Sequence, residues 1–452
     1  VADPAGSYPR FGNGHATRDH KPMYIDRIIL DNIRGFRALD FDLKRPDGSY
    51  AGWTVFTGDN GSGKSTLLKA VAICLTGSET ARALQPSFRG WIRSGEAEAS
   101  IQLEVAGIAA DDGMTGEDRR RGGPFPAKLV LARGDQDVAL SAKKPEGVPR
   151  NYSTPGRSIW SANASGWLSC GYGPFRRVFG ASPEAARAMV SPASERFVTM
   201  FQEAASLAEV DEWLRTLNHK KLEGKAAESA QLDLLLSILS DDLLPNQIVV
   251  DGVDSDGLWL RDRNGVRLSW YEMSDGYRAG LALLADILRH LIKVYGFEGL
   301  TGTDGDGKIF IKRSGVVLID EVDAHLHPEW QRELGFWLKR HFPKIQFLVT
   351  THSPIICQAA DPNGLFVLPE PGAEDPPHAL SGENYQKVVA GRPDTILLTP
   401  AFGLPNTRSP RAVEARAMLA KYRSKRRAGA ELSPQEQQRY RQLELFETQE
   451  EL

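Results

Sequence analysis

Residues 58–65 read GDNGSGKS, and no other stretch of the chain limits its possible folds as strongly. A β-rich apolar run, WTVFT at 53–57, stands directly before it. After it, apolar residues recur at Leu68, Val71, Ala72 and Leu75. This i, i+3, i+4, i+7 spacing predicts a helix with one buried face that ends near Gly77. Strand, glycine loop and helix, in that order, are the setting in which such a loop binds phosphate.

The glycine loop predicts a site for ATP and Mg²⁺. Glycines at 58, 61 and 63 let the backbone curl so that successive N–H groups point at phosphate oxygens, and the helix start adds a partial positive charge. We expect Lys64 to bridge the terminal phosphates and the Ser65 hydroxyl to bind the metal ion. The predicted nucleotide-binding set is Asn60, Gly61, Ser62, Gly63, Lys64, Ser65 and Thr66.

Two carboxylates follow a second apolar run, Val316–Ile319, in the segment SGVVLIDEVDA. An uninterrupted apolar run suits a strand buried on both faces, and its carboxyl end would lie beside the phosphate loop in a parallel sheet. We expect Asp320 to hold Mg²⁺ through water and Glu321 to orient and deprotonate the attacking water. The alternative is a buried strand that ends in a solvated acidic turn.

A third apolar run, in IQFLVTTHS, ends at His352. A histidine at the end of the next strand of the sheet could bind the terminal phosphate and steady the attacking water. A structural histidine is the alternative, since lone histidines after strands have that role more often.

The segment YEMSDGYRAGLALLADILRHL predicts a helix that begins at Ser274-Asp275-Gly276. Ser274 suits an ordinary N-cap. A serine hydroxyl and the Gly276 N–H at a helix start can also bind an anion. A chain with one phosphate loop and a second anion site favours head-to-tail pairing, in which each copy presents its Ser274 end to the nucleotide held by the other.

These segments resemble the Walker A, signature, Walker B with D-loop, and switch-histidine segments of ABC-type ATPases. The resemblance is greatest to the soluble branch that includes RecF, the SMC heads and the overcoming-lysogenisation-defect ATPases. The hairpin-like opening RIILDNIRGFRALDFDL is also similar to that branch, and the resemblance covers residues 24–370. It implies an α/β P-loop NTPase fold: an ABC-type head with an antiparallel β subdomain, a helical signature-bearing subdomain and a helical C-terminal tail.

The resemblance also assigns roles to three further residues. It implies that Asp323 touches the opposite subunit near the nucleotide, and that Arg34 and Arg37 lie near the nucleotide. The sequence departs from the family pattern in two places. Asp275 stands where many ABC proteins have glycine, and the stretch CGYGPFRR at 170–177, the candidate Q-loop region, contains no glutamine.

The motifs and composition shifts predict five regions. These are a flexible N-terminus (1–21), a first ATPase lobe with Walker A (22–180), a helical insert (181–250), a second lobe with signature, Walker B and switch histidine (251–400), and a helical tail (401–452). Ser409-Pro410 and Ser433-Pro434 predict two helix starts in the tail, the second with a capping box.

Composition excludes several other classes. Three separated cysteines without a C-x-x-C motif support neither a disulfide framework nor a zinc site, and favour a reducing cytoplasm. Asp286 interrupts the best candidate for a membrane span. A net charge of −3 does not mark a dedicated nucleic-acid binder, so we interpret the basic runs 119–121, 176–177 and 421–427 as solvated surface.

Three further clusters of histidine or aspartate are interpreted as turns and not as metal sites. The pair His325 and His327 is expected to shape the turn into the next helix. The aspartate-rich stretches 251–257 and 302–307 lack the spacing of a calcium loop, and we expect both to be turns.

The predicted function is that of an ATPase that forms a homodimer or higher oligomer around two ATP molecules and drives a partner. Compact chains of this kind are similar to the ATPase subunit of Septu-type and retron-linked antiphage systems, which implies a separate HNH nuclease partner. Two alternatives stay open: a nucleotide-gated scaffold with negligible turnover, and a RecF-like DNA repair ATPase that binds nucleic acid directly.

Overall fold

The structure is a computed structural model. It describes residues 23–106, 125–135, 137–147, 155–161, 167–178, 188–189, 191–370, 372–373 and 376–450. The chain divides into two compact units, one up to Gly391 and one from Arg392. Among the described residues, no helix is long and apolar enough to cross a membrane.

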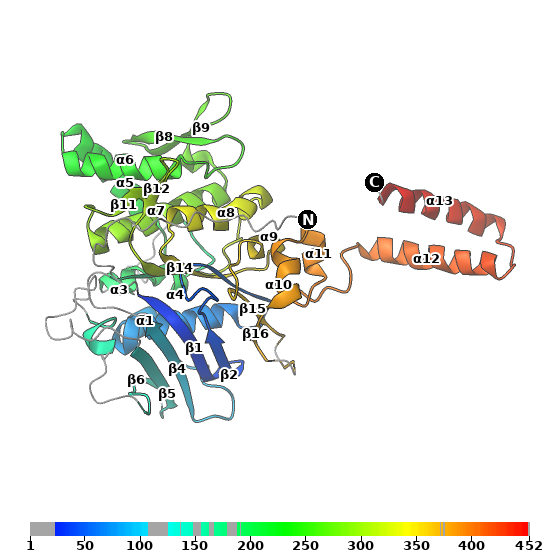
Figure 1. The fold of residues 1–452 in the computed structure, drawn as a ribbon, viewed down its shortest axis with the longest axis horizontal. Helices are drawn as coiled ribbons and strands as arrows, with labels where there is room; N and C mark the ends of the chain where they lie inside the picture. Colours follow the sequence, from blue (N-terminus) through cyan, green and yellow to red (C-terminus); the bar gives the residue numbers. More distant parts are fainter. Residues whose placement is uncertain are drawn as a thin grey trace. The chain divides into compact units, whose positions relative to one another are not determined.

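A six-stranded sheet forms the centre of the first unit (Figure 1). Its order is β16-β15-β3-β14-β13-β7, and all neighbours are parallel except β15 and β16. The strands are β3 (Gly52–Gly58), β7 (Leu168–Tyr172), β13 (Gly315–Ile319), β14 (Ile345–Thr350), β15 (Leu365–Leu368) and β16 (His378–Ala379). Every residue of β7, β13, β14 and β15 is buried, which explains the continuous apolar runs of β13 and β15.

An antiparallel sheet of order β2-β1-β4-β5-β6 forms a second layer. Its strands are β1 (Tyr24–Ile33), β2 (Phe36–Asp42), β4 (Glu98–Ala106), β5 (Phe125–Arg133) and β6 (Val138–Ala142). Strands β1 and β2 pair around a turn at Arg34-Gly35, so the predicted opening hairpin is confirmed. The predicted α/β P-loop fold with an antiparallel β subdomain is confirmed as well.

Helix α1 (Lys64–Leu84) lies between the two sheets and is therefore buried on most sides. The predicted helix end near Gly77 is confirmed in that Gly77 has non-helical angles (φ 78°, ψ 168°), and a second helical stretch follows directly across this kink. A Cβ on Gly77 would lie 2.7 Å from the Trp160 ring, and Trp160 Nε1 donates to the Cys74 carbonyl at 2.7 Å. The kink frees this carbonyl, and a residue distant in sequence then satisfies it.

Helices cover the other face of the central sheet (Figure 1). They include α7 (Asp275–Tyr295), which packs on β7, α8 (Pro328–His341), which packs on β3, and the short α9 (Pro354–Cys357). Beyond α7 lie α5 (Ala208–Leu222), α6 (Ala226–Leu239) and a three-stranded sheet of β8 (Val249–Asp254), β9 (Gly257–Arg261) and β10 (Arg267–Ser269). The remaining elements of this unit are η1 (Pro155–Arg157), η2 (Trp270–Glu272), a hairpin of β11 (Thr301–Thr303) and β12 (Ile309–Ile311), and α10 (Gly382–Val389).

The segment that begins at Ser191 lies in the predicted helical insert and forms three helices, α3 (Pro192–Glu195), α4 (Val198–Phe201) and α5, because Ser206 and Leu207 bind the Arg177 backbone and hold the chain extended before α5. One local expectation needs correction. Residues 251–254 are part of β8, not of a turn, while residues 304–307 do form the turn between β11 and β12.

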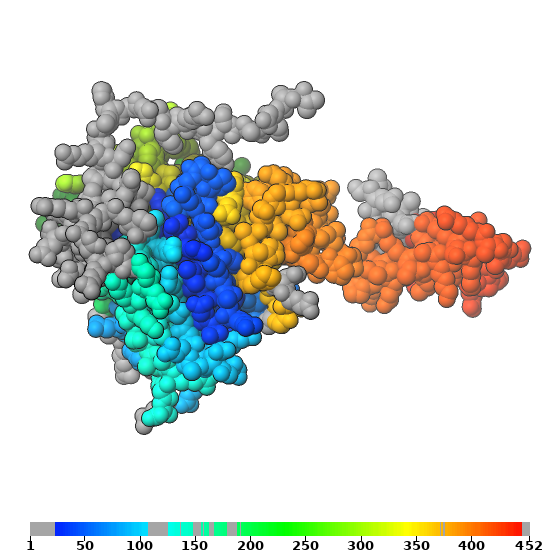
Figure 2. Space-filling view, turned by 60° about the horizontal axis from the view of Figure 1, so that its bottom comes forward, coloured from blue at the N-terminus to red at the C-terminus, as the bar shows by residue number. Residues whose placement is uncertain are grey.

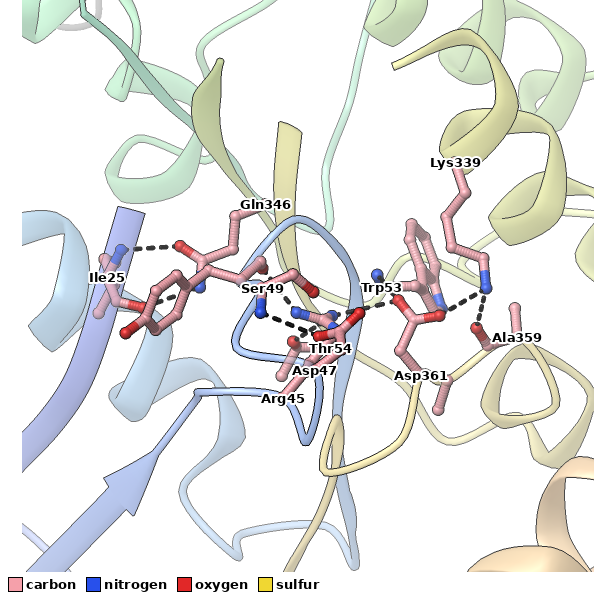
Figure 3. A network of polar contacts seen from close by, with 12 residues as sticks. Ile25, Arg45, Asp47, Ser49, Trp53, Thr54, Lys339, Gln346, Ala359 and Asp361 are labelled. Atoms are coloured by element: carbon pink, nitrogen blue, oxygen red, sulfur yellow. Dashed lines mark hydrogen bonds and ion pairs between the residues drawn. The ribbon is translucent and has the colours of Figure 1, made fainter. Parts of the chain in front are cut away.

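A polar network joins the two sheets at the edge where β3 begins (Figure 3). Asp361 accepts bonds from the Trp53 N–H (2.7 Å), from Arg45 (3.1 Å) and from Lys339 (2.9 Å). Gln346 on β14 exchanges two hydrogen bonds with the backbone of Ile25 on β1, at 2.8 and 2.9 Å. One carboxylate thus satisfies two cations of low exposure, and one amide links the two sheets.

Figure 2 shows the strands β1 and β2, in blue, side by side with the amber segment around residue 380. Just after β2, the Lys44 carbonyl accepts a hydrogen bond from Asn363 Nδ2, in the loop before β15, at 2.7 Å.

The second unit contains α11 (Pro393–Leu397), α12 (Pro410–Arg427) and α13 (Pro434–Glu450). Both predicted helix starts are confirmed. The Ser409 side chain accepts from the Ala412 N–H, and Ser433 and Glu436 form the reciprocal bonds of a capping box. A small core holds α12 and α13 together, consisting of Leu419, Leu432, Tyr440 and Leu443.

Candidate nucleotide-binding site

The glycine loop spans the gap between the end of β3 and the start of α1. Gly58, Gly61 and Gly63 all have positive φ, at 145°, 82° and 97°. A Cβ on Gly58 would lie 2.1 Å from the Leu368 carbonyl oxygen, and one on Gly63 would lie 2.6 Å from the Phe36 ring. These two glycines are therefore required both by backbone conformation and by space.

Lys64 points back into the loop. Its ammonium donates to the carbonyls of Gly58 and Asp59, both at 2.8 Å, and the residue is buried. Burial lowers the pKa of Lys64, although the nearby carboxylates of Asp320 and Glu321 act in the opposite direction. The lysine is thus within electrostatic reach of both predicted catalytic carboxylates.

The loop residues fit a polyphosphate with a divalent cation. The Ser62 hydroxyl is buried without a hydrogen-bond partner among the described residues, and a phosphate oxygen would satisfy it. Asn60 and Gly61 are exposed at the loop tip, and Ser65 and Thr66 are half-buried in the first turn of α1. Within the described ranges, no group of three or more His, Cys, Asp or Glu residues could hold a metal ion. Ser65 and Asp320 are the residues here that would hold Mg²⁺, together with water and phosphate oxygens.

Asp320 follows the last residue of β13, at the same edge of the parallel sheet as the glycine loop. Strand β14 lies between β13 and β3, and its last residue, Thr350, donates its hydroxyl hydrogen to Asp320 Oδ1 at 2.6 Å. The Asp320 N–H donates to the Tyr172 carbonyl at 2.8 Å. Asp320 is buried, so these bonds fix both its backbone and its carboxylate.

Glu321 adopts a left-handed backbone conformation, with φ 46°. Its N–H donates to Thr350 Oγ1 at 2.7 Å, and the next N–H, of Val322, donates to the Thr350 carbonyl at 3.0 Å. Its side chain is half-buried. One threonine therefore binds both predicted carboxylate residues, and it was not singled out from the sequence.

Arg176 is a second residue of this site that the sequence interpretation missed. We expected the pair Arg176-Arg177 to be solvated, which holds for Arg177 but is wrong for Arg176, only 5% exposed. Its guanidinium donates to the carbonyls of Asp320 (3.0 Å) and Glu321 (3.1 Å). Burial lowers the pKa of Arg176 to about 10, although the neighbouring carboxylates oppose that shift. The order of strands in the sheet, which places β7 next to β13, is the signal that would have located it.

The structure places His352 two residues beyond β14, half-buried at the same sheet edge. Asp323 lies in the turn after Glu321, where Thr351 Oγ1 donates to its carboxylate at 2.5 Å. Thr351 also accepts from the Ser353 N–H at 2.9 Å. The switch-histidine segment and the turn containing Asp323 are thereby joined within one chain.

Ser274 begins α7 as expected from its N-cap position, but its exposed side chain makes no capping hydrogen bond. Asp275 pairs with Arg278. A Cβ on Gly276 would lie 2.1 Å from the His325 carbonyl oxygen, so the start of α7 packs tightly on the turn that follows Asp323. His327 caps α8 by accepting from the Glu329 N–H at 3.3 Å.

Arg34 reaches the first turn of α1. Its guanidinium donates to Thr66 Oγ1 at 3.3 Å and lies 4.5 Å from the centre of the Trp91 ring. Its N–H also donates to the Trp91 carbonyl at 2.8 Å. Arg37 is exposed on β2. The structure thus brings Arg34 to the glycine-loop helix, while the role of Arg37 stays a prediction.

Comparison with known protein families gives two matches that together cover most of the site. Residues 27–122 match a family described as "AAA domain", and residues 177–358 match one described as "AAA domain, putative AbiEii toxin, Type IV TA system". The glycine loop lies in the first match, and Ser274, Asp320, Glu321 and His352 lie in the second.

Relatives by sequence include "Septu protein PtuA" of Bacillus mycoides, 26% identical over 74% of this chain and 39% of the relative. "Retron Ec83 probable ATPase" of Escherichia coli is 41% identical over 24% of this chain and 18% of the relative. The matched region is thus well under half the length of either relative. A solved SMC head bound to the C-winged helix domain of ScpA has a TM-score of 0.43 and 14% identity, covering 80% of this chain and 99% of that one.

The glycine loop, the strand order and the acidic residues at the end of β13 define a P-loop nucleotide-binding fold, and two separate stretches of the chain match AAA domain families. Within that class, it is similar to Septu PtuA and the retron ATPases.

Proposed function

We propose that this chain binds ATP with Mg²⁺ and hydrolyses it. One observation carries the proposal: the loop that holds Lys64 and the strand end that holds Asp320 and Glu321 occupy one edge of a parallel sheet, and Thr350 from the intervening strand binds both acidic residues. A phosphate cradle beside a buried carboxylate and a half-exposed one is the arrangement that phosphoryl transfer to water requires.

Each residue has a distinct role in this reaction. The loop N–H groups and Lys64 bind the β- and γ-phosphates. Ser65 and Asp320 would hold Mg²⁺, which when bound neutralises charge on the phosphates. Glu321 accepts a proton from the attacking water as the water oxygen bonds to the γ-phosphorus and the bond to the bridging oxygen of ADP breaks. His352 binds the γ-phosphate from the neighbouring strand end.

We also propose that the complete site needs two chains. Ser274 at the exposed start of α7 has an unused hydroxyl, and Gly276 contributes an N–H in the first turn. Both would bind the γ-phosphate held by a second copy, next to that copy's loop. Asp323 would contact the partner near the nucleotide. Two ATP molecules would then lie between two chains.

The biological output of the proposed dimer would be control of an effector in antiphage defence. The similarity to Septu PtuA and the retron ATPases supports this assignment. A separate HNH nuclease is the effector that we propose, with the helical tail 407–452, which contains α12 and α13, as its docking site. Nucleotide turnover would then switch the nuclease.

Steady-state phosphate release tests the enzymatic proposal. Glu321→Gln should keep ATP affinity and lower kcat by about 10²-fold or more, since a general base contributes about 10²–10⁴-fold. Lys64→Ala should lose ATP binding, whereas Glu333→Gln, an exposed carboxylate on α8, should match the wild type in both measurements. If the wild type binds ATP but releases phosphate no faster than Glu321→Gln, the chain is a nucleotide-gated scaffold instead.

A further inference from the structure

The backbone at Glu321 has a conformation that needs external support. A left-handed φ of 46° costs a residue with a side chain about 1–2 kcal/mol relative to the right-handed region. Such conformations persist where the surrounding structure holds the peptide groups on both sides. At Glu321 these groups are its own N–H and its own carbonyl.

The N–H of Glu321 is held by Thr350, as described above, and its carbonyl is held by Arg176. The same guanidinium also donates to the preceding carbonyl, of Asp320, and back to Gly173 at 3.3 Å. A planar guanidinium that binds two successive carbonyls fixes the orientation of the peptide between them. Its acceptors here are backbone carbonyls, so its charge is not consumed by a direct carboxylate pair.

Arg176 is itself held in place by the strand before it. Tyr172, the last residue of β7, pairs with Ile319 on β13 and donates its hydroxyl hydrogen to Asp286 of α7 at 2.9 Å. A Cβ on Gly173 would lie 2.4 Å from the Thr199 carbonyl oxygen, so the chain passes tightly between its neighbours before it reaches Arg176. The segment 172–176 therefore connects the helix that begins at Ser274 with the backbone that carries the two carboxylates.

We propose that Arg176 is a positioning residue for ATP hydrolysis: by holding the carbonyls of Asp320 and Glu321, it keeps the Glu321 carboxylate aimed at the attacking water. This inference rests on the proposed function. It gives segment 170–177, which contains no glutamine, a role at the backbone of Asp320 and Glu321 that is carried by an arginine.

Arg196 provides a matched control. Its Nε donates to the Ser169 carbonyl at 2.8 Å, so it is also an arginine bound to the chain at β7, but near the amino end of that strand and away from the carboxylates. Arg176→Met and Arg196→Met each remove one such side chain. Arg176→Lys keeps the positive charge but cannot bind two carbonyls as a planar fork.

The first measurement is the kcat and KM of phosphate release, together with ATP affinity. Arg176→Met and Arg176→Lys should lower kcat by about 10²-fold, as expected for a displacement of about 1 Å, with KM and ATP affinity within about threefold of wild type. Arg196→Met should keep kcat within about threefold of wild type, even if its melting temperature falls as much as that of Arg176→Met.

The second measurement is hydrogen exchange of the peptide that covers residues 318–324, which does not depend on turnover. Arg176→Met should accelerate exchange there, and Arg196→Met should not. Wild-type kcat in Arg176→Lys, or equal behaviour of the two methionine variants in exchange, would overturn the positioning role. Absence of turnover in the wild type would refute the proposed function, and the exchange result would still decide whether Arg176 holds the Glu321 backbone.

Discussion

Thr350→Val tests how strongly one hydroxyl organises the catalytic edge. Thr350 is fully buried, and valine has nearly its shape without the hydroxyl. The variant removes a hydrogen bond to the Asp320 carboxylate, worth about 1.5–3 kcal/mol, and leaves the Glu321 N–H unpaired at a cost of about 1–3 kcal/mol. Because valine regains some apolar burial, we expect a net loss of about 2–4 kcal/mol in the free energy of unfolding.

Urea unfolding measures the loss of stability in Thr350→Val, and phosphate release measures its loss of activity. We expect kcat to fall at least about tenfold, which corresponds to 1.4 kcal/mol of transition-state stabilisation. Thr350→Ser retains the hydroxyl and should keep near-wild-type kcat. Thr54→Val removes a buried hydroxyl with only a 3.4 Å contact to Arg45 and should cost less than about 1 kcal/mol. A Thr350→Val variant as stable and as active as Thr54→Val would refute this reasoning.

Three other perturbations probe the dimer, the polar network and acid stability. Ser274→Arg should leave ATP binding to single chains intact but prevent ATP-dependent pairing, so an unchanged increase in light-scattering mass would contradict the two-chain site. Asp361→Asn should lower the free energy of unfolding by about 3 kcal/mol, because it weakens the contacts of Asp361 to Arg45 and Lys339. Asp40→Asn, in the exposed pair with Arg27, should lower it by less than about 1 kcal/mol. Equal losses in denaturant titration would show that the polar network around Asp361 adds no stability. Burial favours protonation of Glu195, but its ion pairs with Lys293 and Arg289 dominate and lower its pKa from 4.5 to about 2. The stabilisation from these pairs is therefore present above pH 4.5 and is lost as the pH falls towards 2. Glu195→Gln should flatten this part of the curve of unfolding free energy against pH, and an unaltered slope would exclude the contribution.

The parts of the fold that were predicted correctly share a local cause. Strands β3, β13 and β14 are buried on both faces, so their sequences are continuous apolar runs, and the motifs stand at their carboxyl ends. The starts of α12 and α13 were also predictable, because a capping serine and proline act within a few residues. These features need no knowledge of distant contacts.

The features that were missed depend on distant partners. A second helical stretch follows the break at Gly77, where Trp160 donates to the freed Cys74 carbonyl. Arg176 is buried because its acceptors, at Asp320 and Glu321, are more than a hundred residues away in sequence. A basic pair after a short strand is usually solvated, so only the order of strands in the sheet could have shown that it ends beside the carboxylates.

The close approach of Gly276 to the His325 carbonyl has a consequence for how a second copy would be recognised. With no room for even a methyl group, the beginning of α7 cannot slide over the turn that contains Asp323. In the proposed dimer, the two elements offered to the partner's nucleotide would therefore dock and release as a single rigid piece. The start of α7 and the turn that contains Asp323 would then bind the partner together, because they are packed tightly within one protomer. No additional contact across the interface would be needed to couple them.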